Sequence, residues 1–62
     1  MRFRDLLKVT KPKTYCVVIV DGERLEDDAY RFEMNHENIL DYMVVSVSAT
    51  FCRLHIYLKK EA

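Results

Sequence analysis

The chain has 62 residues, half of them hydrophobic, with one glycine and one proline. A chain of this length forms one domain, expected over residues 1–62, and it buries only about 60% of the surface of its unfolded state, so it is marginal on its own. Ten basic and ten acidic residues give a formal net charge of zero, which excludes the strongly basic surface of a non-specific DNA-binding protein and the strongly acidic surface of a DNA mimic.

Residues 2–9 predict a short amphipathic helix. Phe3, Leu6 and Leu7 fall at positions i, i+3 and i+4 and therefore share one face. Pro12 prevents the helix from continuing. Because two helical turns are not stable alone in water, we expect this apolar face to dock on a sheet formed by the rest of the chain.

Residues 14–20 (TYCVVIV) predict a strand that carries apolar side chains on both faces, as strands covered on both sides do. Asp21-Gly22 follows directly and is a strong hairpin signal, because glycine adopts a positive φ angle at little cost. We therefore expect the chain to turn back after this strand.

The segment after the turn has two interpretations. Alternation of large side chains at positions 30, 32 and 34 favours a returning strand over residues 29–34, with 23–28 as an irregular approach. The alternative is a helix over 24–34, because apolar residues of the segment also match helical spacing (Leu25, Ala29 and Phe32). The hairpin signal favours the strand.

Residues 35–40 (NHENIL) predict a single helical turn that Asn35 caps. The strongest local signal follows at 42–59, where two runs alternate with period two and predict a β-hairpin. The turn between the runs, residues 48–51 (SATF), contains neither glycine nor asparagine. A four-residue loop built on a type I turn is therefore expected.

These elements predict an α+β domain of two layers, with a short N-terminal helix packed on a small antiparallel β-sheet of about four strands. The alternation assigns to the face under the helix Cys16, Val18, Val20, Met43, Val45, Val47, Leu54 and Ile56. The opposite face then shows Tyr15, Val17, Ile19, Val44 and Tyr57. A contiguous apolar patch of this kind marks an interface, so we expect a homodimer or higher oligomer that associates through Val17, Ile19 and Val44.

The two cysteines, Cys16 and Cys52, both fall in predicted strands at positions that alternate with buried residues. Two free, buried thiols are the favoured interpretation, and a disulfide across neighbouring strands is the alternative. The amino terminus (MRFRDLLKV) lacks the apolar stretch of a signal peptide, and no run approaches the roughly 18 apolar residues of a membrane span. We expect a cytoplasmic protein without membrane association.

Four segments follow one another along the chain: RFRDLLKV, the strand that ends at Asp21-Gly22-Glu23, the turn Ile39-Leu40-Asp41, and VVSVSA at 44–49. In their order and spacing they resemble small accessory proteins of bacteriophages and mobile elements in Firmicutes. The resemblance spans most of the chain and departs in the strand FCRLHIY, which is more acidic in those proteins. It implies a phage protein that works in the bacterial host cytoplasm, in a group that often antagonises bacterial defence. It supplies no catalytic residues.

Cationic and aromatic residues form the candidate ligand site. Arg53 and His55 share a strand face with Tyr57, and Tyr15 is a second candidate for stacking. An aromatic ring between cations can stack on a base while the cations hold a phosphate. The alternative is a solvated outer face with ordinary strand residues.

The largest basic group lies at the amino terminus, where residues 1–13 carry five basic residues and one acidic residue, whereas residues 21–41 carry eight acidic and two basic residues. Arg4, Lys8 and Lys11 are spaced about one helical turn apart and can line one edge of the helix. We expect them to assist in holding a phosphate, and the alternative is a polar face that only promotes solubility.

No cluster of residues predicts a metal, a cofactor or a catalytic centre. His36 lacks further ligands at suitable spacing. Cys52 and His55 are three residues apart in a strand and point to opposite faces, which excludes a Cys–His catalytic pair. Residues 26–28 (EDD) lack the spaced ligands of a calcium loop. We therefore expect a protein that is not an enzyme.

Three functions fit these features. The first, which we expect, is a homo-oligomeric sponge that sequesters a nucleotide signal and so antagonises bacterial immunity, since oligomer interfaces form pockets without a large fold. The second is a protein inhibitor whose acidic segment, residues 21–41, docks on a basic defence nuclease such as a Cas effector. The third is a structural or assembly protein without a ligand.

Overall fold

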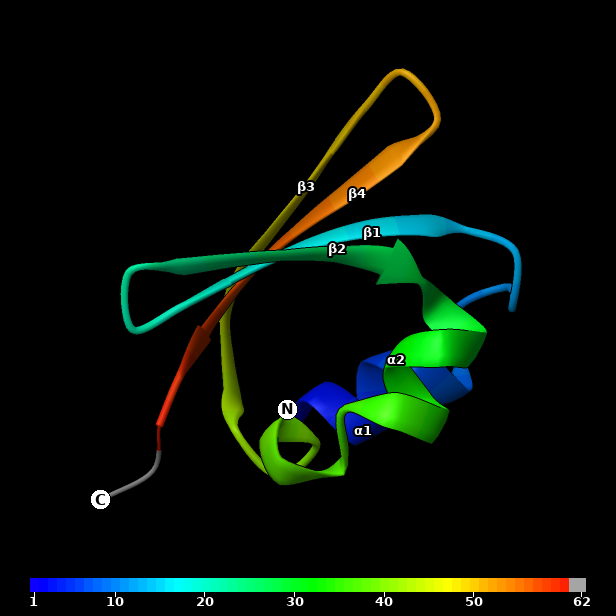
Figure 1. The fold of residues 1–62 in the computed structure, drawn as a ribbon. Helices are drawn as coiled ribbons and strands as arrows, with labels where there is room; N and C mark the ends of the chain where they lie inside the picture. Colours follow the sequence, from blue (N-terminus) through cyan, green and yellow to red (C-terminus); the bar gives the residue numbers. More distant parts are fainter. Residues whose placement is uncertain (61–62) are drawn as a thin grey trace.

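In the computed structural model, which describes residues 1–60, two short helices pack on one side of a four-stranded sheet (Figure 1). Along the chain the elements are α1 (Phe3–Lys8), β1 (Tyr15–Val20), β2 (Glu23–Asp28), α2 (Ala29–Asn35), the 3₁₀ turn η1 (Glu37–Ile39), β3 (Met43–Thr50) and β4 (Arg53–Lys59). The predicted α+β class is confirmed. The predicted domain extends to residue 62, and residues 61–62 lie outside the described residues. No helix within residues 1–60 is long and apolar enough to cross a membrane.

The sheet has the strand order β2-β1-β4-β3. β1 pairs antiparallel with β2, and β3 pairs antiparallel with β4, so a hairpin joins each outer strand to its neighbour. The two central strands, β1 and β4, run parallel, with Tyr15 opposite Arg53 and Ile19 opposite Tyr57. The sheet is thus mixed rather than wholly antiparallel, because the two hairpins meet along their most apolar strands and bury them at the centre.

The core lies between the sheet and the two helices. α1 contributes Phe3 and Leu7, whose side chains are 0% and 4% exposed, so the predicted docking of its apolar face is confirmed. The Phe3 ring meets the Phe32 ring of α2 edge to face, with centroids 5.7 Å apart, an arrangement that is favourable beyond the area it buries. The rest of the core comes from α2, the sheet, η1 and the residue after η1, and consists of Ala29, Cys16, Val18, Val20, Ile39, Leu40, Ile56 and Leu58.

The chain returns from the first hairpin as a strand over Glu23–Asp28, not over 29–34 as predicted. Asp21 and Gly22 have φ angles of 51° and 78°, as in a two-residue hairpin turn with positive φ at both positions. Such a turn brings the chain back into register at once, and Val20 pairs directly with Glu23. The sequence between the turn and residue 29 is therefore the strand itself rather than an approach to it.

Residues 29–34, predicted as the strand, belong to a helix. The Asp28 side chain accepts a hydrogen bond from the backbone N–H of Arg31 at 2.8 Å and caps α2. The helical alternative is therefore correct for the second part of the segment only. Asn35, the predicted cap of the next turn, is instead the last residue of α2.

The β3–β4 hairpin closes with a two-residue turn, not with the predicted four-residue loop. Phe51 and Cys52 have φ angles of 36° and 30°, and Thr50 pairs with Arg53 on either side of them. This turn matches the twist of the strands, but it normally contains glycine or asparagine. Cys52 is consequently exposed rather than buried in a strand, and both cysteines are free thiols, with Cys16 buried.

A bulge in β3 changes which side chains face the helices. Val44 pairs with Leu58 and Ser46 pairs with Tyr57, so Val45 is the extra residue between them. Val44 therefore packs against the core, and its predicted place on the opposite face is wrong. An inserted residue of this kind reverses the alternation of every residue on one side of it.

The bulge and the length of the second hairpin also correct other predictions for the covered face. Val45 is 64% exposed and Met43 lies outside the core. Val47 is on the helix side but is 41% exposed, because the hairpin projects beyond the helices (Figure 1). The other predictions for this face are confirmed, with Leu54 half-buried and full burial of Cys16, Val18, Val20 and Ile56.

Candidate functional site

The side of the sheet that faces away from the helices carries the candidate site, and we call it the open face. Side chains alternate along each strand, and the registers place every second residue of each strand on this face. The central strands contribute Tyr15, Val17, Ile19, Arg53, His55 and Tyr57, and the outer strands contribute Arg24, Glu26, Asp28, Ser46, Ser48 and Thr50. The fold thus brings together four predicted ligand-binding residues, namely Tyr15, Arg53, His55 and Tyr57.

Tyr15 and Arg53 form the best-defined part of the open face. They are neighbours across the parallel strand pair, and the Arg53 guanidinium lies over the Tyr15 ring, with Cζ 5.3 Å from the ring centroid. The Tyr15 hydroxyl donates a hydrogen bond to Glu26 Oε1 at 3.0 Å. This bond is the main cause that raises the pKa of Tyr15 and lowers the pKa of Glu26. At neutral pH the bond is therefore intact, and it orients the ring.

His55 lies in the middle of the open face. Its Nε2 is 3.0 Å from Thr50 Oγ1, so a hydrogen bond joins the two side chains across β3 and β4. The tyrosines on either side remain accessible, since Tyr15 is 38% exposed and Tyr57 is 43% exposed. Both rings can therefore be reached by a ligand.

The interface residues predicted from the sequence do not form one exposed patch. Val17 is 0% exposed and lies between Glu26 and His55 in the register, so it offers no surface to a partner. Val44 faces the helices. Ile19 remains partly exposed, and self-association through this face stays a prediction.

Arg53 differs from three other arginines in its surroundings. Those three are paired with carboxylates within 4 Å: Arg4 with Asp41, Arg24 with Glu26 and Arg31 with Asp28. Within residues 1–60 the contact described for the Arg53 guanidinium is the one with the Tyr15 ring. Its N–H donors are therefore available for an anion, and a guanidinium can bind a phosphate through two parallel hydrogen bonds.

The predicted basic edge of the first helix does not reach the open face. Arg4 and Lys8 belong to α1, which lies on the other side of the sheet (Figure 1). Arg4 Nε donates a hydrogen bond to Asp41 Oδ1 at 2.9 Å, and this bond raises the pKa of Arg4 and lowers the pKa of Asp41. Arg4 thus links α1 to the segment between η1 and β3, while Lys8 is exposed to solvent.

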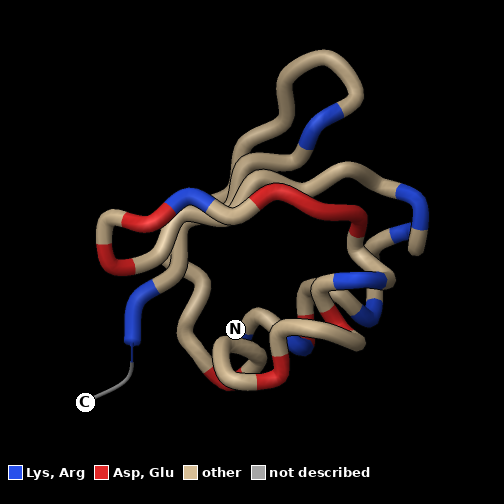
Figure 2. The backbone as a smooth tube through the Cα atoms, viewed as in Figure 1, with Lys and Arg blue, Asp and Glu red and all other residues tan. Residues whose placement is uncertain are grey.

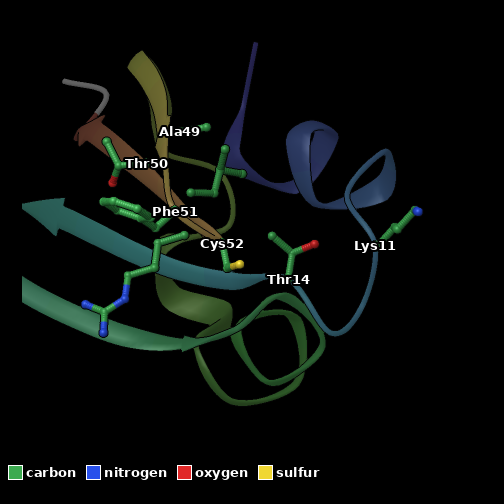
Figure 3. Close-up of a pocket in the computed structure, with 8 residues that line it drawn as sticks. Lys11, Thr14, Ala49, Thr50, Phe51 and Cys52 are labelled. Carbon is green, nitrogen blue, oxygen red and sulfur yellow. The ribbon is translucent and has the colours of Figure 1, made fainter.

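Lys11 and Arg53 both line a groove of about 670 Å³ beside the tip of the second hairpin. The other lining residues are Thr14, just before β1, and residues of the hairpin between 49 and 54. Figure 3 shows Thr14 and Cys52 close together within the groove and Lys11 at its outer end. Because Arg53 belongs to both the groove and the open face, a ligand on that face can extend toward a second cation.

The acidic segment, residues 21–41, is distributed over the molecule rather than gathered on one surface. Figure 2 shows acidic residues along β2 and its turn, and others on the helical side. Four of these carboxylates already accept hydrogen bonds within the chain: Glu26 from Tyr15 and Arg24, Asp27 from the backbone N–H of Asp28, Asp28 from the backbone of α2, and Asp41 from Arg4. Docking through this segment would therefore compete with bonds that hold the fold.

Glu26 and Thr50 are residues of the site that sequence reasoning missed. Each acts through a neighbour in the sheet, because Glu26 orients Tyr15 and Thr50 binds His55. The signal for Glu26 is the alternation within ERLEDD, which places Arg24, Glu26 and Asp28 on one face once residues 23–28 are recognised as a strand. No local signal identifies Thr50, since its position beside His55 depends on the two-residue turn at Phe51 and Cys52, which contains neither glycine nor asparagine.

The arrangement can stack aromatic rings and hold an anion. The part of the chain that the structure describes contains no group of three or more His, Cys, Asp or Glu side chains that could hold a metal ion. Comparison with protein-family models, with curated proteins and with solved structures found no match for this chain. What the open face binds is therefore inferred from its own geometry.

Proposed function

We propose that this chain is a non-enzymatic binding protein that sequesters a nucleotide signal on the open face of its sheet. Tyr15 and Tyr57 stack on bases, and Arg53 holds a phosphate. The observation that carries the proposal is the juxtaposition on the two central strands of exposed tyrosines and an arginine that forms no ion pair with a carboxylate within residues 1–60. The face around them is free of helices (Figure 1).

Base stacking and phosphate binding are the two interactions through which the open face would hold a nucleotide. Each base that stacks on an aromatic side chain contributes about 1–3 kcal/mol, and stacking tolerates any base because every base has a π face. The planar guanidinium of Arg53 suits a phosphate better than a lysine does, because it offers two donors in a fixed geometry. A nucleotide therefore matches both kinds of side chain on the open face.

The spacing of the two tyrosines favours a ligand with two or more bases. Tyr57 lies opposite Ile19, four residues along β1 from Tyr15. At about 3.3 Å per residue, the two tyrosines lie roughly 13 Å apart along the strand direction. One base cannot stack on both rings, so a cyclic or short linear oligonucleotide fits better than a mononucleotide.

A long nucleic acid fits less well than a small signal. Non-specific binding of long DNA or RNA needs a strongly basic surface. Alternation along the strands gives the open face three cations and two carboxylates: Arg24, Arg53 and Lys59 against Glu26 and Asp28. In the phage context that the sequence resemblance implies, the proposed role is to lower the free concentration of an immune signal in the host.

Isothermal titration calorimetry with a panel of mono-, di- and trinucleotides, cyclic and linear, tests the proposal. We expect saturable binding of a compound with two or more bases. Arg53→Ala and Tyr57→Ala should each weaken its affinity about tenfold or more, because each removes at least about 1.4 kcal/mol of binding free energy. The matched controls are Arg31→Ala and Tyr30→Ala on α2, where both side chains are exposed, and these should bind like the wild type.

Two results of the titration contradict the proposal, and a separate binding experiment distinguishes its alternative. No heat with any nucleotide rejects it, and unchanged affinity in both open-face variants rejects the assigned site. If the chain ignores nucleotides but binds a purified Cas nuclease, inhibition of a defence protein is the correct function instead.

A further inference from the structure

We propose that the chain forms a homodimer in which β3 of one copy pairs antiparallel with β3 of a second copy, so that two four-stranded sheets become one sheet of eight strands. This interface is the edge of the sheet, not the open face that the sequence pattern suggested. It rests on the unpaired edge of β3 and is independent of the proposed nucleotide.

The outer edge of β3 is unpaired from residue 45 onward among the described residues. The amino terminus covers only the beginning of the strand, where Arg2 bridges to Met43 and the Val44 N–H donates to the Met1 carbonyl at 2.9 Å. The rest of β3, through Thr50, is exposed. A row of backbone donors and acceptors is therefore available there for another strand.

The two edges of the sheet are protected very differently. β2, the other edge strand, has the sequence ERLEDD, in which five of six residues are charged. β3 has the sequence MVVSVSAT, with eight residues and neither a charge nor a proline. Charge and proline are the usual means by which proteins prevent edge-to-edge pairing. Because β2 is protected by charge and β3 is not, we infer that β3 is the edge that pairs. A strand without charges can also lie beside a copy of itself without electrostatic repulsion.

The turn geometry shows which backbone groups are free. Thr50 and Arg53 flank a two-residue turn, so they form a hydrogen-bonded pair in the hairpin. From Thr50 backward along β3, residues that bond to β4 alternate with residues whose backbone groups point away from β4. Val47 and Ala49 belong to the second kind and direct their N–H and C=O groups toward the unpaired edge. In the antiparallel dimer that we propose, Val47 of one copy bonds to Ala49 of the other on both sides of the two-fold axis.

This pairing places Ser48 on the axis, facing Ser48 of the second copy. The register then brings Phe51 of one copy beside Val45 of the other, and the same contact recurs at the opposite end of the seam. These side chains are 99% and 64% exposed in the single chain, so the dimer covers two large apolar groups at each end. An axis at Val47 would instead place Phe51 of one copy beside Met43 of the other, but the backbone of Met43 already pairs with Arg2 of its own chain.

Pairing at this edge keeps both open faces on the same side of the joined sheet, because the two-fold axis runs perpendicular to the strands and to the sheet. The small hydroxyl side chains of Ser46, Ser48 and Thr50 line the seam on that side. Cross-strand pairs of Ser and Thr are favourable in antiparallel sheets. The dimer therefore presents two copies of the open face as one continuous surface.

Sedimentation equilibrium with charged variants tests the interface. The wild type at micromolar to millimolar concentrations should show twice the protomer mass of 7.4 kDa. Ser48→Lys and Ser48→Glu should each be monomeric, because like charges meet on the axis, and their equimolar mixture should restore the dimer. Ser46→Lys is the matched control, since it adds the same charge on the same strand face but meets Thr50 of the second copy, and it should remain dimeric.

A wild type that stays monomeric over this range overturns the proposal, and so does a Ser48→Lys variant that stays dimeric. Ile19→Glu separates the edge from the open face as the interface. It should remain dimeric if β3 pairs with β3, whereas its conversion to a monomer would place the interface on the open face.

Cross-linking tests the register without depending on the charged variants. In a Cys52→Ser background, Ser48→Cys should form a covalent dimer under mild oxidation, because facing residues of a non-hydrogen-bonded pair have Cα atoms about 4.5 Å apart, within the range that a disulfide spans. Ser46→Cys should not, since the two copies of that residue lie roughly 13 Å apart. Equal cross-linking in both variants, or none in either, overturns the register.

Discussion

Phe51 and Cys52 hold a backbone conformation that ordinary side chains disfavour. Their φ angles are 36° and 30°, and a left-handed conformation costs a residue other than glycine about 1–2 kcal/mol. The double change Phe51→Asn with Cys52→Gly supplies the residues that such a turn prefers, so we expect a higher melting temperature by circular dichroism. The double variant should be compared with its parent in the Ser48→Lys background, where we expect both proteins to be monomeric, so that self-association does not affect the melting temperature. A lower melting temperature for the double variant would contradict the assigned turn.

The two thiols should differ sharply in reactivity. Burial raises the pKa of the Cys16 thiol to about 11, and the reactive form is the thiolate, whereas Cys52 is exposed in the turn. Alkylation of the native protein at neutral pH should therefore modify one thiol rapidly and the second only after unfolding. Cys52→Ser should abolish the rapid phase, and equal rates for both thiols in the native wild type would be inconsistent with this fold.

At the scale of elements, α1 is held to the sheet by its apolar face. Leu7→Ala should lower the free energy of unfolding by about 2–5 kcal/mol, because the side chain is 4% exposed and its loss leaves a cavity. A small domain has only a few kcal/mol of stability, so substantial unfolding is expected. Val9→Ala is the control, since Val9 is 78% exposed. Equal urea midpoints for the two variants would show that α1 does not dock.

The bond between Arg4 and Asp41 makes stability depend on pH. The hydrogen bond from Arg4 lowers the pKa of the Asp41 carboxyl below its ordinary value of 3.8, so the folded protein binds this proton less readily than the unfolded chain. The resulting stability is present above pH 3.8 and is lost as the pH falls through the lower folded-state pKa. Urea midpoints of the wild type and Asp41→Asn should converge below that pH, and a constant difference would contradict the linkage.

Element boundaries followed local sequence signals only where those signals were unambiguous. The Phe3 and Leu7 face and the Asp21-Gly22 turn were predicted correctly, because spacing and glycine chemistry act over a few residues. β2 was missed, since an edge strand of charged residues lacks apolar alternation. The bulge at Val45 was missed for a different reason, because no residue type in MVVSVSAT marks an insertion.

At the scale of the whole molecule, the open face depends on pairing between distant segments. Tyr15 and Arg53 meet because β1 and β4 are parallel neighbours, and no local pattern specifies which strands occupy the centre of a sheet. The sequence indicated seven residues suited to a nucleotide, and the fold brings four of them together on the open face, namely Tyr15, Arg53, His55 and Tyr57. The sequence could not show that Arg4 donates a hydrogen bond to Asp41 on the other side of the sheet.

Chemical-shift mapping tests the central claim, that a nucleotide binds on the open face, most directly. Spectra of ¹⁵N-labelled protein should be recorded during titration with cyclic di- and trinucleotides. The claim predicts that the largest shifts come from Tyr15, Arg53, His55 and Tyr57, while the amides of α1 and α2 stay unchanged. Shifts confined to the helices, or no shift with any nucleotide, would contradict it.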